Sequence, residues 1–404
     1  MLVACHYSAD YSNTHYQCPD GKCPSGFVCV AGYCEKSGSG DMGIDDGAPS
    51  TCTSTLAMAH AHVCTVIGAT GETLCWGHGE DGELGNDTRA NIGMPQTVVG
   101  LASPTSLAVG GRHTLAVRDG KLWAWGFNGH YQLGDGTMTD RFVPTLSGGG
   151  VSDWTEIATA SRGSCGRRGS SVACWGCLAY PTDQSVDPHC TTNQSTITNV
   201  SLPAAAVQLV AGHSHFCALL ADESVWCWGR NDEGQLGNGT TTDSAAPVRV
   251  ALDGATQLSA GRRHSCAIKA GEVYCWGSND SAQIDATYTD TSTPIRIPNL
   301  TGATQVSAGG WHTCALANGK AYCWGADTVG QIGDGVAGGD QTDPREVQGL
   351  APPIVEIRAG NASACARTAR GVECWGGNAR GELGIGNTDA LPHPMPVMVP
   401  LGCP

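Results

Sequence analysis

The sequence predicts an all-β protein: a seven-bladed β-propeller of four-stranded antiparallel blades, preceded by a small cysteine-rich disulfide knot. The first observation is a Trp-Gly pair that closes an apolar, strand-like run seven times. The second is that these pairs recur every 48 to 53 residues, and a constant period of about fifty residues is typical of propeller blades. The tryptophans are Trp76, Trp125, Trp175, Trp228, Trp276, Trp324 and Trp375.

Three segments follow from the composition along the chain. Residues 1–36 hold five cysteines and little apolar sequence, which predicts a disulfide-stapled knot. Residues 37–50 are rich in Gly, Ser and Asp, which predicts a flexible linker. We expect the propeller to occupy residues 51–404.

The sixth repeat serves as a template for one blade. Its residues 303–308 and 312–316 have the pattern of two strands. The Asn-Gly pair at 318–319 predicts a type I′ hairpin turn into a third strand at 320–324. A loop that contains Gly-Gln-Ile-Gly then leads to a short outer strand at 344–347. Four antiparallel strands of this kind make one propeller blade.

Cysteine pairs recur in six of the repeats. With the Asn-Gly pair at the hairpin tip, Cys314 lies opposite Cys323, and opposed residues have Cβ atoms ~4.5–5.5 Å apart, near enough for a disulfide. The second repeat has Leu115 opposite Ala124 there, so a disulfide replaces an apolar contact. Buried free thiols or metal ligands are the alternatives, but metal ligands converge, whereas these pairs lie one to a blade. The expected bridges are Cys64–Cys75, Cys165–Cys174, Cys217–Cys227, Cys266–Cys275, Cys314–Cys323 and Cys365–Cys374.

The remaining cysteines can also be assigned. Cys177 and Cys190 bracket an insertion in the third repeat, and Cys52 and Cys403 lie at the two ends of the predicted ring, so we expect each of these pairs to form a bridge. Two further bridges, with three alternative connectivities, are expected among Cys18, Cys23, Cys29 and Cys34.

Cys5 is left over from this pairing. It follows Leu2-Val3-Ala4, a short match to a bacterial lipobox, and we expect it to carry a lipid anchor. Only four residues precede it, without the charged and apolar regions of a signal peptide. An unpaired or intermolecular Cys5 is therefore the alternative.

Charge and cysteine content narrow the function classes. The chain has 404 residues and a net charge of −15 without any Lys/Arg run, which argues against nucleic-acid binding. No apolar run is long enough to span a membrane. Twenty-one cysteines, mostly at regular positions, predict an oxidising, extracytoplasmic location.

The repeats carry a recognisable motif, clearest in the fourth. It reads His-Phe-Cys-Ala-Leu at 215–219, Trp-Gly-Arg-Asn at 228–231 and Gly-Gln-Leu-Gly-Asn-Gly-Thr at 234–240. This pattern resembles the regulator of chromosome condensation repeat, covers all seven repeats and is weakest in the third. The resemblance implies a seven-bladed propeller. It implies several functions: members include an exchange factor for a small GTPase, ubiquitin ligase modules, a UV photoreceptor and a secreted bacterial β-lactamase inhibitor. The acidity, the disulfides and the N-terminal knot favour the secreted branch.

Signals of catalysis are weak. A histidine opens the second strand in five repeats, and we expect its ring to satisfy backbone groups of the blade. Pairs such as His60/His62 and His213/His215 could project on one face and bind zinc, but no third ligand is nearby. The Gly-Gln-Leu-Gly turns are not phosphate loops, since none continues to Lys-Ser/Thr or opens a helix. We therefore expect no catalytic residue, cofactor or metal.

One loop face is the candidate binding surface. Trp311 occupies a loop position that other repeats fill with arginine or serine, and aromatic and arginine residues on a rigid face are typical interface anchors. We expect a monomeric, extracytoplasmic, non-enzymatic propeller that binds a protein partner through this face. The alternatives are an exchange factor for a small GTPase and a hydrolase at the channel mouth. The candidate face is Arg112, Phe127, Tyr131, Tyr180, Arg263 and Trp311.

Overall fold

The structure is a computed structural model that describes residues 27–30, 33–36, 52–178 and 193–402. The chain divides into two units, Met1–Ala48 and Pro49–Pro404. In the first unit, β1 (Phe27–Val30) pairs antiparallel with β2 (Tyr33–Lys36). The expected bridges of the knot and the lipid anchor at Cys5 involve positions outside the described residues.

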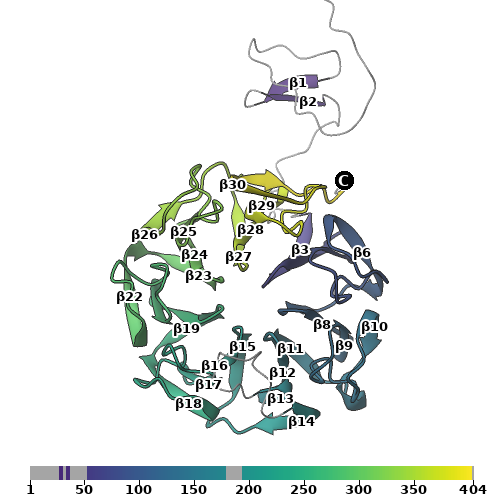
Figure 1. Cartoon of the computed structure of the whole chain (residues 1–404), viewed down its shortest axis with the longest axis vertical. Helices are drawn as coiled ribbons and strands as arrows, with labels where there is room; N and C mark the ends of the chain where they lie inside the picture. Colours follow the sequence, from purple (N-terminus) through teal and green to yellow (C-terminus); the bar gives the residue numbers. More distant parts are fainter. Residues whose placement is uncertain (1–26, 31–32, 37–51, 179–192, 403–404) are drawn as a thin grey trace, which may run out of the picture. The chain divides into compact units, whose positions relative to one another are not determined.

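The second unit is a ring of seven four-stranded antiparallel sheets, which confirms the predicted fold class (Figure 1). Each blade uses four consecutive strands, and the first strand of each blade is the innermost. Blade 1 consists of β3 (Thr53–Met58), β4 (His62–Ile67), β5 (Glu72–Gly77) and β6 (Ile92–Ala102). Blade 2 consists of β7 (Ser106–Val109), β8 (His113–Arg118), β9 (Lys121–Gly126) and β10 (Arg141–Leu146). Blade 3 consists of β11 (Trp154–Thr159), β12 (Gly163–Arg168), β13 (Ser171–Cys177) and β14 (Asn193–Val200).

The other four blades repeat the same order. The outer strand of blade 5 is 11 residues long. The outer strand of blade 6 begins at Gln341, earlier than the short strand expected at 344–347. Blades 4 to 7 are β15 (Ala206–Ala211), β16 (His215–Leu220), β17 (Ser224–Gly229) and β18 (Ser244–Asp253); β19 (Ala255–Ala260), β20 (His264–Lys269), β21 (Glu272–Gly277) and β22 (Thr291–Thr301); β23 (Ala303–Ala308), β24 (His312–Ala317), β25 (Lys320–Gly325) and β26 (Gln341–Glu346); and β27 (Ile354–Ala359), β28 (Ser363–Thr368), β29 (Gly371–Asn378) and β30 (Asp389–Met398).

No helix in the described ranges is long and apolar enough to cross a membrane. The core of the ring lies between neighbouring blades. For example, all six residues of β24 are buried, and Ile284 from the loop of blade 5 packs with Trp324 of blade 6. Each blade therefore buries its apolar face only by contacting the next one, as expected of a repeat fold.

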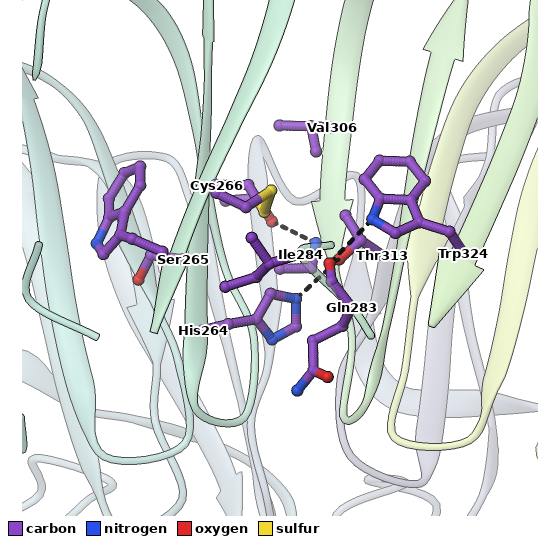
Figure 2. Close-up of a disulfide and its surroundings, with 12 residues drawn as sticks. His264, Ser265, Cys266, Gln283, Ile284, Val306, Thr313 and Trp324 are labelled. Atoms are coloured by element: carbon purple, nitrogen blue, oxygen red, sulfur yellow. Dashed lines mark hydrogen bonds between the residues drawn. A yellow bond between two sulfur atoms is a disulfide. The ribbon is translucent and has the colours of Figure 1, made fainter. Parts of the chain in front are cut away.

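A hydrogen-bonded relay joins each of several blades to the next (Figure 2). Between blades 5 and 6, the backbone carbonyl of Gln283 accepts bonds from Trp324 Nε1 and Thr313 Oγ1, both 2.9 Å long. Thr313 Oγ1 is also 2.9 Å from His264 Nε2. Because the threonine hydroxyl donates its one hydrogen to the carbonyl, His264 Nε2 must be the donor to Thr313. The imidazole of His264 thus bonds to a hydroxyl of the neighbouring blade. The expectation that this histidine ring satisfies backbone groups of the blade is therefore wrong.

The tryptophan-to-carbonyl bond of this relay is also present where the ring closes between blades 7 and 1, and an arginine adds a second bond there. Trp76 Nε1 donates to the carbonyl of Glu382 at 2.9 Å, and Arg358 Nε donates to the carbonyl of Leu56 at 3.2 Å. No strand is exchanged between the first and last blades. Cys52 is disulfide-bonded, and its expected partner Cys403 lies outside the described residues.

All six bridges expected within blades are present. In each, the two cysteines are cross-strand partners of one hairpin, with Cα atoms 4.0–4.1 Å apart. The register puts Leu115 opposite Ala124 in blade 2, as predicted. Cys177 is also disulfide-bonded, and its expected partner Cys190 is not among the described residues.

We expect the Cys314→Leu/Cys323→Ala double variant to fold with a loss of about 2–3 kcal/mol in the free energy of unfolding, the cost of opening a loop of this size. The reason is that blade 2 buries Leu115 and Ala124 at the equivalent positions. Urea unfolding monitored by circular dichroism measures the loss. A Cys314→Ser/Cys323→Ser variant is the control and should lose more, because it buries two hydroxyls at fully buried sites. Equal losses in both variants would contradict the proposed apolar equivalence.

Candidate functional site

The inner strands surround a central cavity of about 420 Å³. The cavity reaches the loops that join the first strand of each blade to the second, where one equivalent residue from each blade lines it. We call these residues the mouth ring: His60, Gly111, Ser161, His213, Arg262, Gly310 and Asn361.

Backbone hydrogen bonds hold the mouth ring in place. Arg262 N donates to the carbonyl of Gly309 at 2.9 Å, and Gly310 N donates to the carbonyl of Gly360 at 2.8 Å. The same kind of bond closes the ring from Asn361 N to the carbonyl of His60 at 3.2 Å. Six of the seven mouth loops are bonded in this way to the next blade, so the side chains that they carry are presented on a rigid frame.

Two histidines approach each other at the mouth. His60 from blade 1 and His213 from blade 4 have ring centroids 6.1 Å apart. Burial, with the charge of Arg262 as a further cause, lowers the pKa of His60 to about 4 and that of His213 to about 3. Both rings are therefore neutral at pH 7.

The expectation that His60/His62 and His213/His215 project as pairs on one face is wrong. His62 is fully buried and its Nε2 lies 2.8 Å from Thr114 Oγ1 of the next blade. His215 contacts Ser265 in the same way, at 2.7 Å. One histidine of each pair thus belongs to the relay between blades, and the other lines the cavity.

Arg262 and Trp311 meet beside these histidines. The Arg262 guanidinium lies 4.3 Å from the centroid of the Trp311 ring, a cation–π contact between blades 5 and 6. Burial lowers the pKa of Arg262 from its usual value, and the neighbouring charge of Arg263 acts in the same direction. Arg263 was predicted for the binding face, and Arg262 was not. The available signal was that no other repeat has arginine at the position of Arg262, as Ser161 and Gly310 show.

The other predicted arginines pair with acids of the preceding blade. Arg112 donates to both carboxylate oxygens of Asp81, at 2.5 and 2.7 Å, and lies 4.4 Å from the centroid of the Phe127 ring. Arg263 Nη1 is 2.5 Å from Glu233 Oε1. Both arginines thus link neighbouring blades, and their charges are already paired.

Tyr131 and Tyr180 differ from the rest of the predicted face. Tyr131 has φ 64 in a turn where other repeats have Gly82 and Gly234. A Cβ added to Gly234 would lie 2.6 Å from Cα of Ser292 in the outer strand of the next blade. Because Tyr131 is equivalent to Gly234 in the repeat, it lies in the outer part of its loop. Tyr180 is outside the described residues.

His78, Asp81 and Glu83 form a buried cluster that could in principle hold a metal ion. Its atoms already have partners, however. Glu83 accepts from Asp81 N at 2.8 Å and contacts His78 Nδ1, while Asp81 is held by Arg112. Other repeats have Gln at the position of Glu83. In blade 5 this residue is Gln283, whose Oε1 accepts from Ser281 N and whose Nε2 donates to Ser278 Oγ in the same loop. The cluster is therefore explained as a variant of the repeat.

In five of the blades, the loop after the Trp-Gly pair is organised around one buried polar side chain. In blade 4 this is Asn231, whose Nδ2 donates to the carbonyls of Thr240 and Thr242 at 2.9 and 3.0 Å. Blade 6 has Asp327 at this position. Its Oδ1 accepts from Ile332 N at 3.1 Å, but its buried Oδ2 has no hydrogen-bond partner. Burial raises the pKa of Asp327 to about 6.

We expect Asp327→Asn to stabilise the protein by roughly 1–3 kcal/mol at pH 8. The substitution removes a buried charge and restores the donor that Asn231 supplies in blade 4. The raised pKa of Asp327 destabilises the fold as pH rises from the pKa of the unfolded carboxyl towards about 6, because the folded state resists ionisation. The stability gained by Asp327→Asn should therefore shrink near pH 4. Thermal and urea unfolding at both pH values measure this. A gain that is the same at pH 4 and pH 8 would contradict the assignment.

The motif of these loops and strands matches a known family. The family model of the regulator of chromosome condensation repeat matches residues 70–117, 119–168, 222–268 and 270–316. A second model of this repeat matches residues 206–235, 255–283 and 303–331. The chain belongs to the regulator of chromosome condensation repeat family. The resemblance inferred from the sequence is thereby confirmed.

Relatives within this repeat family are diverse. The ultraviolet-B receptor UVR8 of Arabidopsis thaliana is 30% identical over 230 residues, which are 53% of this chain and 50% of the receptor. The human E3 ubiquitin-protein ligase HERC2 is 28% identical over 269 residues, 50% of this chain and 6% of the ligase. The chain therefore spans half or less of the length of these relatives.

Two solved structures share the architecture of this chain. Prp20p from Saccharomyces cerevisiae has a TM-score of 0.72 at 20% identity, covering 87% of this chain and 88% of its own. Human WBSCR16 has a TM-score of 0.71 at 19% identity, covering 82% and 94%. At these identities the likeness shows the fold alone.

Proposed function

We propose that this chain is a non-enzymatic, protein-binding propeller that acts outside the cytoplasm. The observation that carries the proposal is the rigid mouth, where Arg262 is stacked on Trp311 and its backbone is bonded to Gly309 of the next blade. Arginine and tryptophan on a rigid surface are typical energetic anchors of protein interfaces. A preorganised surface also loses little conformational entropy on binding.

The disulfides support the proposed location. Six bridges at equivalent positions within blades would not persist in a reducing cytosol. A lipid on Cys5, as the sequence predicts, would attach the propeller to a membrane surface. Mass spectrometry of the N-terminal peptide tests that part separately.

Relatives support a binding role in general terms. The structural report on Prp20p concerns its binding to Gsp1p and histones, and HERC2 is named as a ubiquitin ligase. Exchange activity on a small GTPase is therefore the second candidate, on family grounds alone. It would need a cytosolic location, which the disulfides oppose.

Affinity capture from envelope and culture extracts tests the proposal. We expect the wild-type propeller to retain a protein that Trp311→Ala loses, because the substitution removes the aromatic half of the anchor. Leu146→Ala is the matched control, since Leu146 is an exposed apolar residue on the outer strand β10. Equal capture by wild type and Trp311→Ala would place the binding surface elsewhere. Capture of a cytosolic GTPase alone would favour the exchange-factor candidate.

A further inference from the structure

Basic residues gather at the mouth although the chain carries a net charge of −15. The pKa of His213 is lowered by burial and also by the nearby charges of Arg262, Arg263 and Arg162, of which Arg263 is paired with Glu233. Among the described residues that line the cavity, Glu156 is the one acid, and it pairs with Arg167 at 2.8 Å. The charge of Glu233 also acts on Arg262, but this carboxylate is paired with Arg263, so no ion pair among the described residues holds Arg262 itself.

Arg262 differs from the other described arginines. Most of them hold a carboxylate, such as Arg141 with Asp135 at 2.7 Å. Arg345, Arg370 and Arg380 have neither an ion pair nor a side-chain hydrogen bond, but they are exposed to water. Arg262 is partly buried and also lacks an ion pair and a side-chain hydrogen bond; its described contact is the Trp311 ring. A partly buried charge without a counter-charge is costly, so this guanidinium is available to an external anion.

The surroundings of Arg262 fit a small anionic group. The neutral rings of His60 and His213 line the same cavity. His213 Nδ1 lies 2.9 Å from Ser214 Oγ; when the hydroxyl donates to Nδ1, the proton of the His213 ring is on Nε2, which can donate a hydrogen bond, as can one nitrogen of His60. Below the mouth the cavity is lined by small side chains such as Ala108, Ala158 and Ser259, which leave room for the group that enters.

We propose that the channel mouth is a carboxylate-binding site, in which Arg262 holds the carboxylate while His60 and His213 donate to it. Arginine presents a planar pair of N–H donors that matches a carboxylate, and Trp311 fixes the plane of this fork. Under the proposed function the carboxylate belongs to the protein partner, and this identification rests on that function. Its source is an acidic side chain or a chain terminus, since both present the same group.

Calorimetric titration with three peptide probes tests the site without the partner. The first probe is acetyl-Gly-Gly-Glu-Gly-Gly-amide, the second is acetyl-triglycine with a free terminal carboxylate, and the third is acetyl-pentaglycine amide, which has no carboxylate. We expect the first or the second to bind and the third not to bind. The stronger of the first two identifies an acidic side chain or a chain terminus as the source.

Variants connect the binding to Arg262. Arg262→Ala should weaken carboxylate binding about tenfold or more, because it removes hydrogen bonds to a charged group. Arg262→Lys should restore part of the affinity, since it keeps the charge and loses the fork. Arg345→Ala, the same loss of charge at an exposed position on β26, should leave binding unchanged.

Several outcomes would overturn the carboxylate site. These are equal binding of the amide probe, unchanged affinity in Arg262→Ala, an equal loss in Arg345→Ala, or tighter binding of inorganic phosphate than of either carboxylate peptide. The two proposals fail separately. Capture that depends on Trp311 without carboxylate binding would refute this site alone, whereas carboxylate binding without any captured protein would refute the protein-binding role alone.

Discussion

Acidification from pH 7 to pH 5 is expected to destabilise the propeller strongly, by an amount that approaches its whole free energy of unfolding. The cause is a set of histidines that open the second strands and are fully buried. Burial lowers the pKa of His113 and His264 to about 3 and that of His215 and His312 to about 4. Burial also lowers the pKa of His62 well below its usual value.

The sign follows from proton binding. An unfolded histidine has a pKa near 6.5, so below that pH the unfolded chain binds protons that the folded chain excludes. Stability is therefore fully present above about pH 6.5 and falls as pH drops towards the folded values. Each histidine costs about 2 kcal/mol by pH 5, and five together approach the ~5–15 kcal/mol of a typical domain. Carboxyl groups with a raised pKa, such as Glu233, offset part of this loss.

Urea unfolding between pH 5 and pH 7 measures the effect, and His312→Leu assigns it to the buried rings. Neither ring nitrogen of His312 has a hydrogen-bond partner, because blade 7 has Ala364 where four other blades have threonine or serine. The variant should therefore keep most of its stability at pH 7. Its stability should depend on pH less steeply, by about one proton or ~1.4 kcal/mol per pH unit. An unchanged slope would exclude His312 as a source of acid sensitivity.

The second large effect concerns the glycine of the Trp-Gly pair. We expect Gly277→Ala to cost about 3–5 kcal/mol, since it adds left-handed backbone strain to a steric overlap. Gly277 has φ 107, and an added Cβ would lie 2.5 Å from the carbonyl oxygen of Arg263 and 2.8 Å from Cα of His264. The strand and the mouth loop approach so closely that only glycine fits between them. Urea unfolding gives the loss.

Gly239→Ala is the matched control for this prediction. Gly239 has φ 84, but an added Cβ would meet nothing within 4 Å. Its cost should therefore be the backbone strain alone, about 1–2 kcal/mol. If both variants lose the same stability, the close approach at Gly277 is not the reason for the motif.

The sequence was sufficient for the fold because the repeat carries its information locally. The tryptophan spacing predicts the blade count, and the Asn-Gly turn sets the register that places Cys314 opposite Cys323. The bounds of the outer strands were harder to predict. The fourth strand is partly exposed and has few apolar positions, as the β26 sequence Gln-Thr-Asp-Pro-Arg-Glu shows, so its hydrophobic pattern is weak.

The mouth could not be predicted in the same way. His60 and His213 are 153 positions apart in the chain, and only closure of the ring brings their rings within 6.1 Å. Arg112 and Arg263 look like free anchors in the sequence, yet each pairs with an acid from the preceding blade. Which arginine lacks a partner depends on neighbouring blades, and no single repeat contains that information.

Every bridge described between two identified cysteines closes a hairpin of one blade, and its two cysteines are 9 to 11 positions apart in the chain. Each pair can therefore meet as soon as its own hairpin has left the ribosome or the export channel. The correct partner is then the nearest one available, and oxidation can proceed blade by blade in the order of synthesis. These six bridges should therefore form without extensive disulfide shuffling, and their formation in an oxidising compartment should depend little on a disulfide isomerase.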